Sequence, residues 1–557
     1  MTKCYAILMA QINIKGSDLV KKKRSLSFIL ASVLLIGTLA ACTPTTQQPV
    51  APVGDTATPA QQQAPTPPSQ AAAPEPEQAA HVNRGVTLAI ASETPSVAPA
   101  RHTALIGQFK NMLTHNGLFR TYYEDLSPVP DLIASWVALS DTLFEFTLHE
   151  GILFHNGEEL TAYDVVISLA YSRNYPEAVA VHGSVYQTAV IDRYTFTIDT
   201  GTPNAMLFFD LAHHGNMIMP SSLIEAGHDF MAEPIGTGPF VFYEWRFGDS
   251  LTFTAFEDYF DTSRFPQVEY VHWRVIPEGA SRTIALETGE VDYIVEVAFP
   301  DIPRLEENPD ITVFQRPGVT YSYLILNNDH PTFSSVYVRR AIEMALDKDA
   351  MVIASLDGFG IPIWTSVPPM FPGASTEGTN SFDPDGARAL LAEHGIDPAS
   401  IAFDILAFDE SQRRRGEVVQ SNLADIGIHV TITMIDFATW LTVAGTPTSE
   451  AAFGNFTGQG NILNFMRTVL HIDGIDAQNR SRLYSRELSD LIDEAVATID
   501  INDRLAVLEE ATTLSNELVA HIGTNMNILI RAFDSRLVSP EISANGFMFL
   551  NMVYWAE

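Results

Sequence analysis

The chain has 557 residues, 46% of them hydrophobic, and its 67 acidic side chains outnumber 32 basic ones, for a formal charge of −35. From residue 42 onward, 26 basic and 66 acidic residues remain, a formal charge of −40, and the only lysines are Lys110 and Lys348. Nucleic acids and anionic surfaces are bound through clustered cations, so this composition argues against both as partners. The acidity would favour cationic ligands by long-range steering, or it reflects only the solubility chemistry of the source organism.

The first segment, residues 1–41, contains the parts of a secretory signal. A basic patch at 21–24 precedes an apolar run at 28–39 and then two small residues. The run is shorter than the about 20 apolar residues of a membrane span, although a short N-terminal anchor is the alternative interpretation. The sequence Leu-Ala-Ala-Cys ending at Cys42 resembles a bacterial lipobox, which implies cleavage before Cys42 and lipidation of its thiol. Residues 1–20 fit no part of a signal, and we interpret them as the product of a misplaced start codon.

A linker follows the cysteine. Residues 43–83 are almost entirely Pro, Gln, Ala and Thr and include no aromatic residue. Such a composition cannot bury enough apolar surface to fold. We therefore assign residues 42–84 to the lipidated Cys42 and a disordered tether with a reach of up to roughly 100 Å. Acylation of Cys42 would leave the mature chain without a pair of cysteines for a disulfide.

The remaining 470 or so residues mix strands and helices, and they are too many for one core. The segments 195–200, 251–256 and 270–276 alternate polar and apolar residues as half-buried strands do. The stretch 401–436 predicts a strand, a helix and a second strand, a unit typical of parallel sheet. The pattern therefore indicates an α/β protein with more than one lobe.

Two helix starts are well marked. Thr161 is a suitable cap, and Asp164 three residues later can complete a capping box. Asp383 precedes Pro384 at the first position of a second helix, and Gly395 is expected to end that helix.

Enzyme signatures are missing from the sequence. It has no GxSxG elbow, no Walker A loop and no HExxH motif. The spacing of His149 and His155 does not suit two ligands on one helical face, and "DPDG" at 383–386 is explained as a helix cap. A histidine pair at 213–214 is the remaining metal candidate, and we interpret it as accidental. No catalytic residue, metal or cofactor is therefore expected.

Six segments, in order, resemble one family: the extracytoplasmic solute-binding proteins of ABC importers, in the peptide/nickel group (family 5). They include "LHEGILFHNGEELTAYDVVISL", "GTGPFVFYEWRFGDSLTF" and "YLILNNDHPTFSSVYVRRAIEMALDKD". The resemblance extends from about Val86 to the C-terminus. Its segments are 148–169, 236–253, 285–294, 323–349, 383–396 and 420–432.

This resemblance implies a type II periplasmic-binding-protein-like α/β fold with two hinged lobes. Lobe I would comprise 85–319 plus 530–557, with an extra subdomain at about 110–235, and lobe II would comprise 320–529. It also implies a monomer that encloses a peptide or small-molecule ligand by lobe closure. The partners would be permease subunits with a cytoplasmic ATPase, and the protein would be lipid-anchored on the outer face of the cell membrane, on the periplasmic side where an outer membrane exists.

One departure from the family concerns the ligand. Peptide-binding members carry an aspartate in lobe II that pairs with the free amino group of the peptide, but the corresponding segment here, 451–470, has no acidic residue. A desolvated ammonium without a partner costs several kcal/mol, so a free peptide N-terminus is a poor match for this segment. Its amide and aromatic side chains suit hydroxyls or amides. The ligand-binding candidates are Tyr323, Trp364, Trp440, Asn455, Phe456, Gln459, Asn461 and Arg467.

Alternatives remain for several of these residues and for the function. A core role is equally consistent for Trp440 and for Tyr321 on the hinge strand, and Arg467 also suits a surface or cap position. The favoured function is an importer lipoprotein that captures an oligopeptide or a solute of similar size. An oligosaccharide or nickel-chelate receptor, a peptide-signal receptor and, less favoured, a secreted hydrolase are the alternatives.

Overall fold

The computed structural model describes residues 85–93, 97–99, 105–124, 126–175, 184–457, 460–538 and 542–556, all within one compact unit. Cys42 and Gln459 lie outside the described residues. No helix among the described residues is long and apolar enough to cross a membrane.

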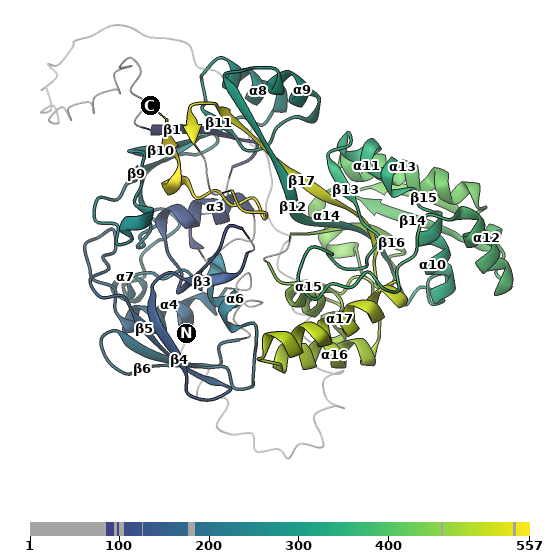
Figure 1. Cartoon of the computed structure of the whole chain (residues 1–557), viewed down its shortest axis with the longest axis horizontal. Coiled ribbons are helices and arrows are strands. Elements are labelled where there is room, and N and C mark those ends of the chain that lie inside the picture. Colours follow the sequence, from purple (N-terminus) through teal and green to yellow (C-terminus); the bar gives the residue numbers. More distant parts are fainter. Residues whose placement is uncertain are drawn as a thin grey trace, which may run out of the picture. The chain divides into compact units, whose positions relative to one another are not determined.

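A mixed eleven-stranded sheet connects two groups of elements (Figure 1). One end of the sheet is built from N-terminal strands, the other from strands that follow residue 400, and the long strands β12 and β17 pair in the middle. In spatial order the strands are β15 (His429–Met434), β14 (Ala402–Ala407), β16 (Ala451–Thr457), β12 (Ile311–Leu326), β17 (Ile522–Asp534), β11 (Tyr293–Ile294), β1 (Gly85–Ile90), β10 (Tyr270–Val275), β9 (Ser250–Ala255) and β8 (Phe240–Arg246), with β13 (Gly360–Pro362) paired to β17.

The first group of elements, lobe I, carries a second sheet of four strands in the order β4-β5-β7-β6. Its core includes Phe146, Phe154 and Phe196, which are fully buried. Lobe I contains β4 (Ile133–Ala138), β5 (Leu143–Leu148), β6 (Gln187–Val190), β7 (Thr195–Asp199), the short pair β2 (Phe119–Thr121) and β3 (Pro128–Pro130), the helices α3 (Leu105–Thr114), α4 (Ala162–Ser172), α6 (Leu207–Leu211), α7 (Ser221–Ala226), α8 (Gly279–Glu287) and α9 (Ile302–Glu306), and the C-terminal pair β18 (Leu537–Val538) and β19 (Tyr554–Trp555).

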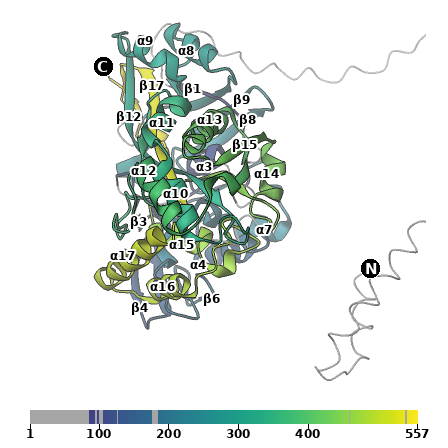
Figure 2. The ribbon, with the colours of Figure 1, turned by 90° about the vertical axis from the view of Figure 1, so that its right-hand side faces the viewer.

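The second group, lobe II, contains most of the helices that follow the hinge strand β12. In both Figure 1 and Figure 2, α16 lies beside the part of lobe I that holds β4 and β6. The helices are α10 (Val336–Ala345), α11 (Lys348–Leu356), α12 (Pro384–Glu393), α13 (Glu410–Asp425), α14 (Phe437–Val443), α15 (Ile462–Val469), α16 (Arg486–Ala497) and α17 (Ile501–Glu517).

The local sequence signals of both helix starts are confirmed. At the start of α4, the Thr161 N–H and hydroxyl both donate to one carboxylate oxygen of Asp164, at 2.8 and 2.7 Å. At the start of α12, Asp383 accepts the N–H of Gly386 at 2.8 Å, and Gly395 after the helix has φ +66°. The predicted strand-helix-strand unit is present as β14, α13 and a parallel β15.

The hinge strands change register where they leave lobe I. Strand β12 pairs with β17 from Ile311 to Pro317 and again from Tyr321, with an irregularity between these two stretches. Gly318 lies in this gap, and a Cβ atom there would lie 2.9 Å from the carbonyl oxygen of Asn527. A side chain would therefore force the two strands apart at the point where the sheet passes from one lobe to the other.

Candidate functional site

A pocket of about 410 Å³ lies against the hinge strands, a volume within the usual range of small-molecule sites. Gly318 and Thr320 of β12 and residues 527–531 of β17 line one side of it. The other walls come from helix α3, from distant loops of lobe I and from the C-terminal segment, through Phe109, Ser92, Val295, Glu296, Val297, Phe299, Ala544 and Asn545.

A strip of uncharged polar side chains begins at this pocket and continues along one face of the sheet. Ser322 is paired with Asn455 on β16 and with Asn525 on β17, so the three side chains share a face. One step nearer the pocket, Thr320 is paired with Thr457, and their hydroxyl oxygens are 3.1 Å apart. We define the polar strip as Thr320, Ser322, Asn455, Thr457, Asn525 and Asn527.

The polar strip offers hydrogen bonds without charge. The side-chain amide of Asn525 donates to that of Asn527 at 2.8 Å, and Asn527 lines the pocket. Hydroxyls and amides both donate and accept, so the members of the strip that line the pocket or are exposed can match amide or hydroxyl groups of a ligand. These are Thr320 and Asn527 in the pocket and Asn455 and Thr457 beside it, whereas Ser322 and Asn525 are buried.

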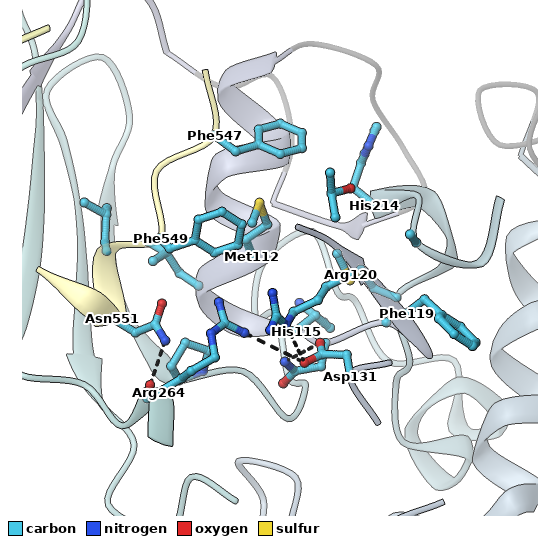
Figure 3. A pocket seen from close by; sticks show the side chains of 18 of the residues that line it. Met112, His115, Phe119, Arg120, Asp131, His214, Arg264, Phe547, Phe549 and Asn551 are labelled. Carbon is cyan, nitrogen blue, oxygen red and sulfur yellow. Dashed lines mark hydrogen bonds and ion pairs between the residues drawn. The ribbon is translucent and has the colours of Figure 1, made fainter. Parts of the chain in front are cut away.

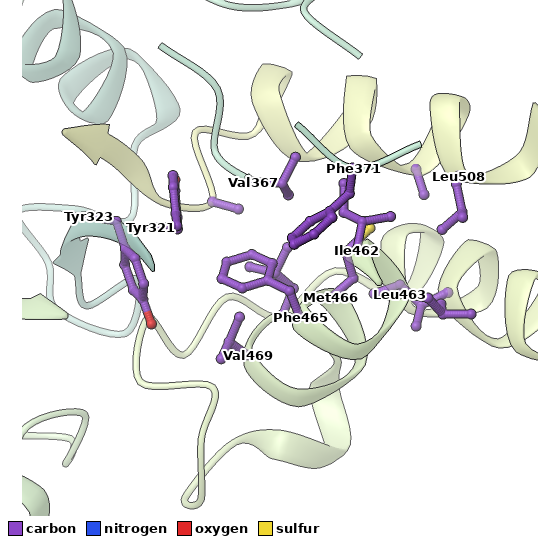
Figure 4. Packing of buried hydrophobic residues seen from close by; sticks show 14 of the residues in the cluster. Tyr321, Tyr323, Val367, Phe371, Ile462, Leu463, Phe465, Met466, Val469 and Leu508 are labelled. Carbon is purple, nitrogen blue, oxygen red and sulfur yellow. The ribbon is translucent and has the colours of Figure 1, made fainter. Parts of the chain in front are cut away.

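The opposite face of the same strands is aromatic and buried. Tyr323 stacks on Tyr321, with ring centroids 5.1 Å apart, and on His521 at 4.4 Å, while Phe465 meets both tyrosines edge-on (Figure 4). Burial raises the pKa of Tyr323 to about 12 and lowers that of His521 to about 3. Tyr321 donates its hydroxyl to the carbonyl of Thr365, which fits the core role considered for it.

The candidates Tyr323 and Phe456 both lie on this aromatic face. Tyr323 is buried in the cluster, and Phe456 packs edge-on against Phe465 at 5.0 Å. Their backbone borders the polar strip, but their rings point away from it. Of the predicted residues on β16, only Asn455 is on the strip, where it is exposed.

The two candidate tryptophans do not line the pocket of about 410 Å³ against β12 and β17, which we call the hinge pocket. Trp364 lines a separate groove of about 510 Å³ in lobe II, and the Lys348 ammonium lies 4.0 Å from its ring centroid. Trp440 is buried beneath Arg480, whose guanidinium is 4.8 Å from the ring centroid, and Phe437 stacks against the same ring. Aromatic faces attract cations in this way, which accounts for both contacts without a ligand.

Asn461 immediately precedes α15 and Arg467 lies on it, and this helix faces lobe I. Asn461 caps this helix by accepting the N–H of Leu463 at 2.8 Å, and its amide nitrogen lies 3.2 Å from the sulfur of Met206 in lobe I. Arg467 is exposed, and its charge lowers the pKa of Asp210 in lobe I against the larger effect of burial. These two residues are thus placed at the contact between the lobes, and their role in ligand binding stays a prediction, as it does for the other candidates.

Two charged groups at the pocket have no local sequence signal. Glu296 is exposed and accepts the backbone N–H of Ala91 at 3.0 Å. Arg531 is buried and donates to the carbonyls of Val295, at 2.5 Å, and Gly546, at 3.3 Å, and its burial lowers its pKa. Arg531 therefore holds the C-terminal segment against the hinge, while Glu296 is the one carboxylate among the described lining residues.

A smaller cavity of about 40 Å³ lies inside lobe I, around the buried Asp131 (Figure 3). Asn116 donates to this carboxylate at 2.8 Å, while the guanidinium nitrogens of Arg120 and Arg264 are 3.8 and 3.9 Å from its other oxygen. Burial raises the pKa of Asp131, against the opposing effect of the two arginines. We assign this cluster to the interior of lobe I, since none of its residues lines the hinge pocket.

The chain matches a known family over most of its folded part. The family model for bacterial extracellular solute-binding proteins, family 5, matches residues 127–472. The dipeptide-binding protein of Escherichia coli (strain K12) is 25% identical over 434 residues, which cover 71% of this chain and 81% of that protein.

Solved structures share the fold. HbpA2 from Haemophilus parasuis superimposes with a TM-score of 0.76 at 22% identity, over 85% of this chain and all of that one. The periplasmic binding protein DppA from Helicobacter pylori, in complex with the peptide STSA, gives a TM-score of 0.74 at 23% identity, over 85% of this chain and 98% of that one. The two-lobe α/β fold predicted from the sequence is confirmed by these likenesses.

Proposed function

Because the chain belongs to the bacterial extracellular solute-binding proteins of family 5, we propose that it captures a solute for an ABC importer. Lobe I, residues 85–319 plus 530–557, and lobe II, residues 320–529, would close on the solute about β12 and β17. The permease would then receive it from the closed form. The pocket of about 410 Å³ against these two strands supports this assignment, because hinge motion changes the shape of a site placed there.

The uncharged polar strip is the observation that points to the class of solute. The solute is an oligopeptide, or a molecule of similar size, that is held through amides or hydroxyls rather than through a free ammonium group. Glu296 is exposed, and an ion pair at an exposed carboxylate contributes only about 0.2–1 kcal/mol. An ammonium group would therefore add little affinity. N-terminally blocked peptides and oligosaccharides fit the strip as well as free peptides do.

The test compares the peptide Ser-Thr-Ser-Ala with its N-acetylated form by isothermal titration calorimetry. The dissociation constants should agree within about threefold, because no buried carboxylate loses a partner on acetylation. Asn455→Asp is the matched variant: it places a second exposed carboxylate beside the site and should favour the free amine by only about 0.2–1 kcal/mol, the contribution of an exposed ion pair. Loss of binding on acetylation in the unchanged protein contradicts the proposal, and steady conversion of the peptide to products would favour the hydrolase alternative.

The lipid anchor is a further part of the proposed function. The lipobox-like sequence ending at Cys42 supports lipidation at this residue, and the Pro-rich sequence after it supports a tether between the membrane and lobe I. The protein would then work on the outer face of the cell membrane as a monomer beside its permease.

A further inference from the structure

Leu126 of lobe I has a buried side chain although it lies on a tight turn between β2 and β3. The turn is closed by hydrogen bonds from the Tyr122 N–H to Ser127 and from the Leu126 N–H to Tyr122, at 2.8 and 3.0 Å. Only 2% of Leu126 is exposed, because it packs into an apolar cluster built mainly from lobe II, including Ile462. The contact that buries Leu126 therefore runs from lobe I to lobe II.

The contact of Leu126 with lobe II depends on a glycine. Gly460, at the start of α15, has φ +81°, and a Cβ atom there would lie 2.4 Å from both the Cβ and the carbonyl oxygen of Leu126. Real Cβ atoms do not approach so closely, so any other residue at 460 would push the turn of lobe I away. Leu126 itself has φ +62°, a conformation that a leucine rarely adopts without a compensating contact.

A second apolar side chain of lobe I enters the same cluster. Met206 is 3% exposed, and next to it the Ala205 N–H donates to the carbonyl of Val496 in α16 at 2.9 Å. The side chain of Asn204 braces this segment, since its oxygen accepts the Met206 N–H at 2.9 Å and its amide donates to Ser184 at 3.1 Å. Lobe I thus presents two side chains on separately braced backbone segments to one surface of lobe II.

We propose that Leu126 and Met206 form an interlobe latch, a pair of positioning residues that stabilises the closed arrangement of the lobes whatever solute is bound. The proposal rests on the proposed function, in which closure accompanies capture. A contact made only in the closed form shifts the equilibrium toward it, and the apparent affinity for every solute rises by the same factor. The latch is separate from the polar strip, so it affects how tightly solutes are held and not which ones.

The latch is tested first by the distance between the lobes in the full chain. Spin labels are attached at Tyr163→Cys and Ile501→Cys, exposed positions on α4 and α17, after Cys4 and Cys42 are replaced by serine. Double electron–electron resonance should show longer distances in Gly460→Ala than in the parent.

Gly157→Ala is the matched control for the distance measurement, since Gly157 has φ +82° but no atom within 4 Å of the added Cβ. It should leave the distances unchanged. Leu126→Gly is the second test variant, because glycine accepts φ +62° and the change removes only the side chain. Leu126→Gly replaces Gly460→Ala in the distance measurement if the melting transition of Gly460→Ala shows that this variant does not fold.

Binding of Ser-Thr-Ser-Ala and of longer peptides then separates the latch from other roles. Leu126→Gly should weaken each of them by the same factor, roughly ten- to a hundredfold for the loss of one buried leucine. Unchanged label distances in both variants overturn the proposal. A loss of affinity that grows or shrinks with peptide length also overturns it, because Leu126 would then contact the ligand directly. Absence of any peptide binding counts against the proposed function alone, because the distances test the latch without a ligand.

Discussion

Replacing Asp210 with asparagine should change how the stability of this protein depends on pH. The carboxyl group lies in lobe I, and burial, opposed by hydrogen bonding from Ser184 and by the charge of Arg467, raises its pKa from 3.8 to about 7. Asparagine has the same shape, cannot ionise and can still accept the hydrogen bond from the Ser184 hydroxyl.

The direction of the effect follows from proton binding. Between pH 3.8 and about 7 the folded protein holds the proton on Asp210 more tightly than the unfolded chain does, so the stability contributed by this group falls as pH rises. The loss is complete above about pH 7. The difference between a pKa of 3.8 and one of about 7 corresponds to about 4 kcal/mol of stability. The free energy of unfolding of Asp210→Asn, relative to the parent, should therefore rise by up to about 4 kcal/mol across this range.

The assay is urea unfolding of the parent and the variant at pH 4, 5, 6, 7 and 8. Asp258→Asn, a change at an exposed loop position, is the control for the loss of one acidic group from a very acidic protein. It shows how much of any change in stability comes from removing one negative charge at the surface. If the curves of Asp210→Asn and the parent run parallel from pH 4 to 8, Asp210 does not carry the raised pKa and the reasoning fails.

Two further predictions concern other charged or modified groups. Lys348 and Glu343 are both buried, with Nζ and Oε1 3.5 Å apart. Lys348→Met alone should lower the free energy of unfolding by about 3–5 kcal/mol, because it leaves the carboxylate uncompensated. Lys348→Met combined with Glu343→Gln should cost less than the sum of the two single changes. Urea unfolding of the four proteins measures this coupling, and strict additivity would show that the pair does not interact. If Cys42 is lipidated, mass spectrometry of the membrane-bound protein should find the modification there, and Cys42→Ser should appear in the medium or periplasm; a Cys42→Ser protein that stays on the membrane contradicts the lipid anchor.

Local signals were sufficient for much of the fold. The helix caps at Thr161 and Asp383 need only residues within one turn, and the unit 401–436 is marked by a change from alternating to helical periodicity. The course of β12 was harder to predict, because its register irregularity at Gly318 depends on the carbonyl of Asn527, about 200 residues later in the chain. The proposed boundary between the lobes at 319–320 falls inside this strand.

The site was predictable only in part for a similar physical reason. Asn455 and Phe456 are neighbours on β16, but alternation places Asn455 on the polar strip and Phe456 against the buried aromatic cluster. Only the pairing partners decide which face of the strand is which. Glu296 and Asn545 reach the pocket from loops far apart in the sequence. The contact of Trp364 with the buried Lys348 is likewise marked by no local pattern, and a role of Trp364 in ligand binding stays a prediction.

The burial of both lysines has a practical consequence for anyone who handles this protein. Lys110 and Lys348 are fully buried, and they are the only lysines in the part of the chain that the structure describes. The surface of that part therefore offers no side-chain amine to acylating dyes, aldehyde fixatives or sugars that react with amines, and trypsin can cut its exposed segments only after arginine. Immobilisation or cross-linking of the folded lobes has to use their abundant carboxylates, and any amine labelling that does appear there reports that a lobe has opened or unfolded.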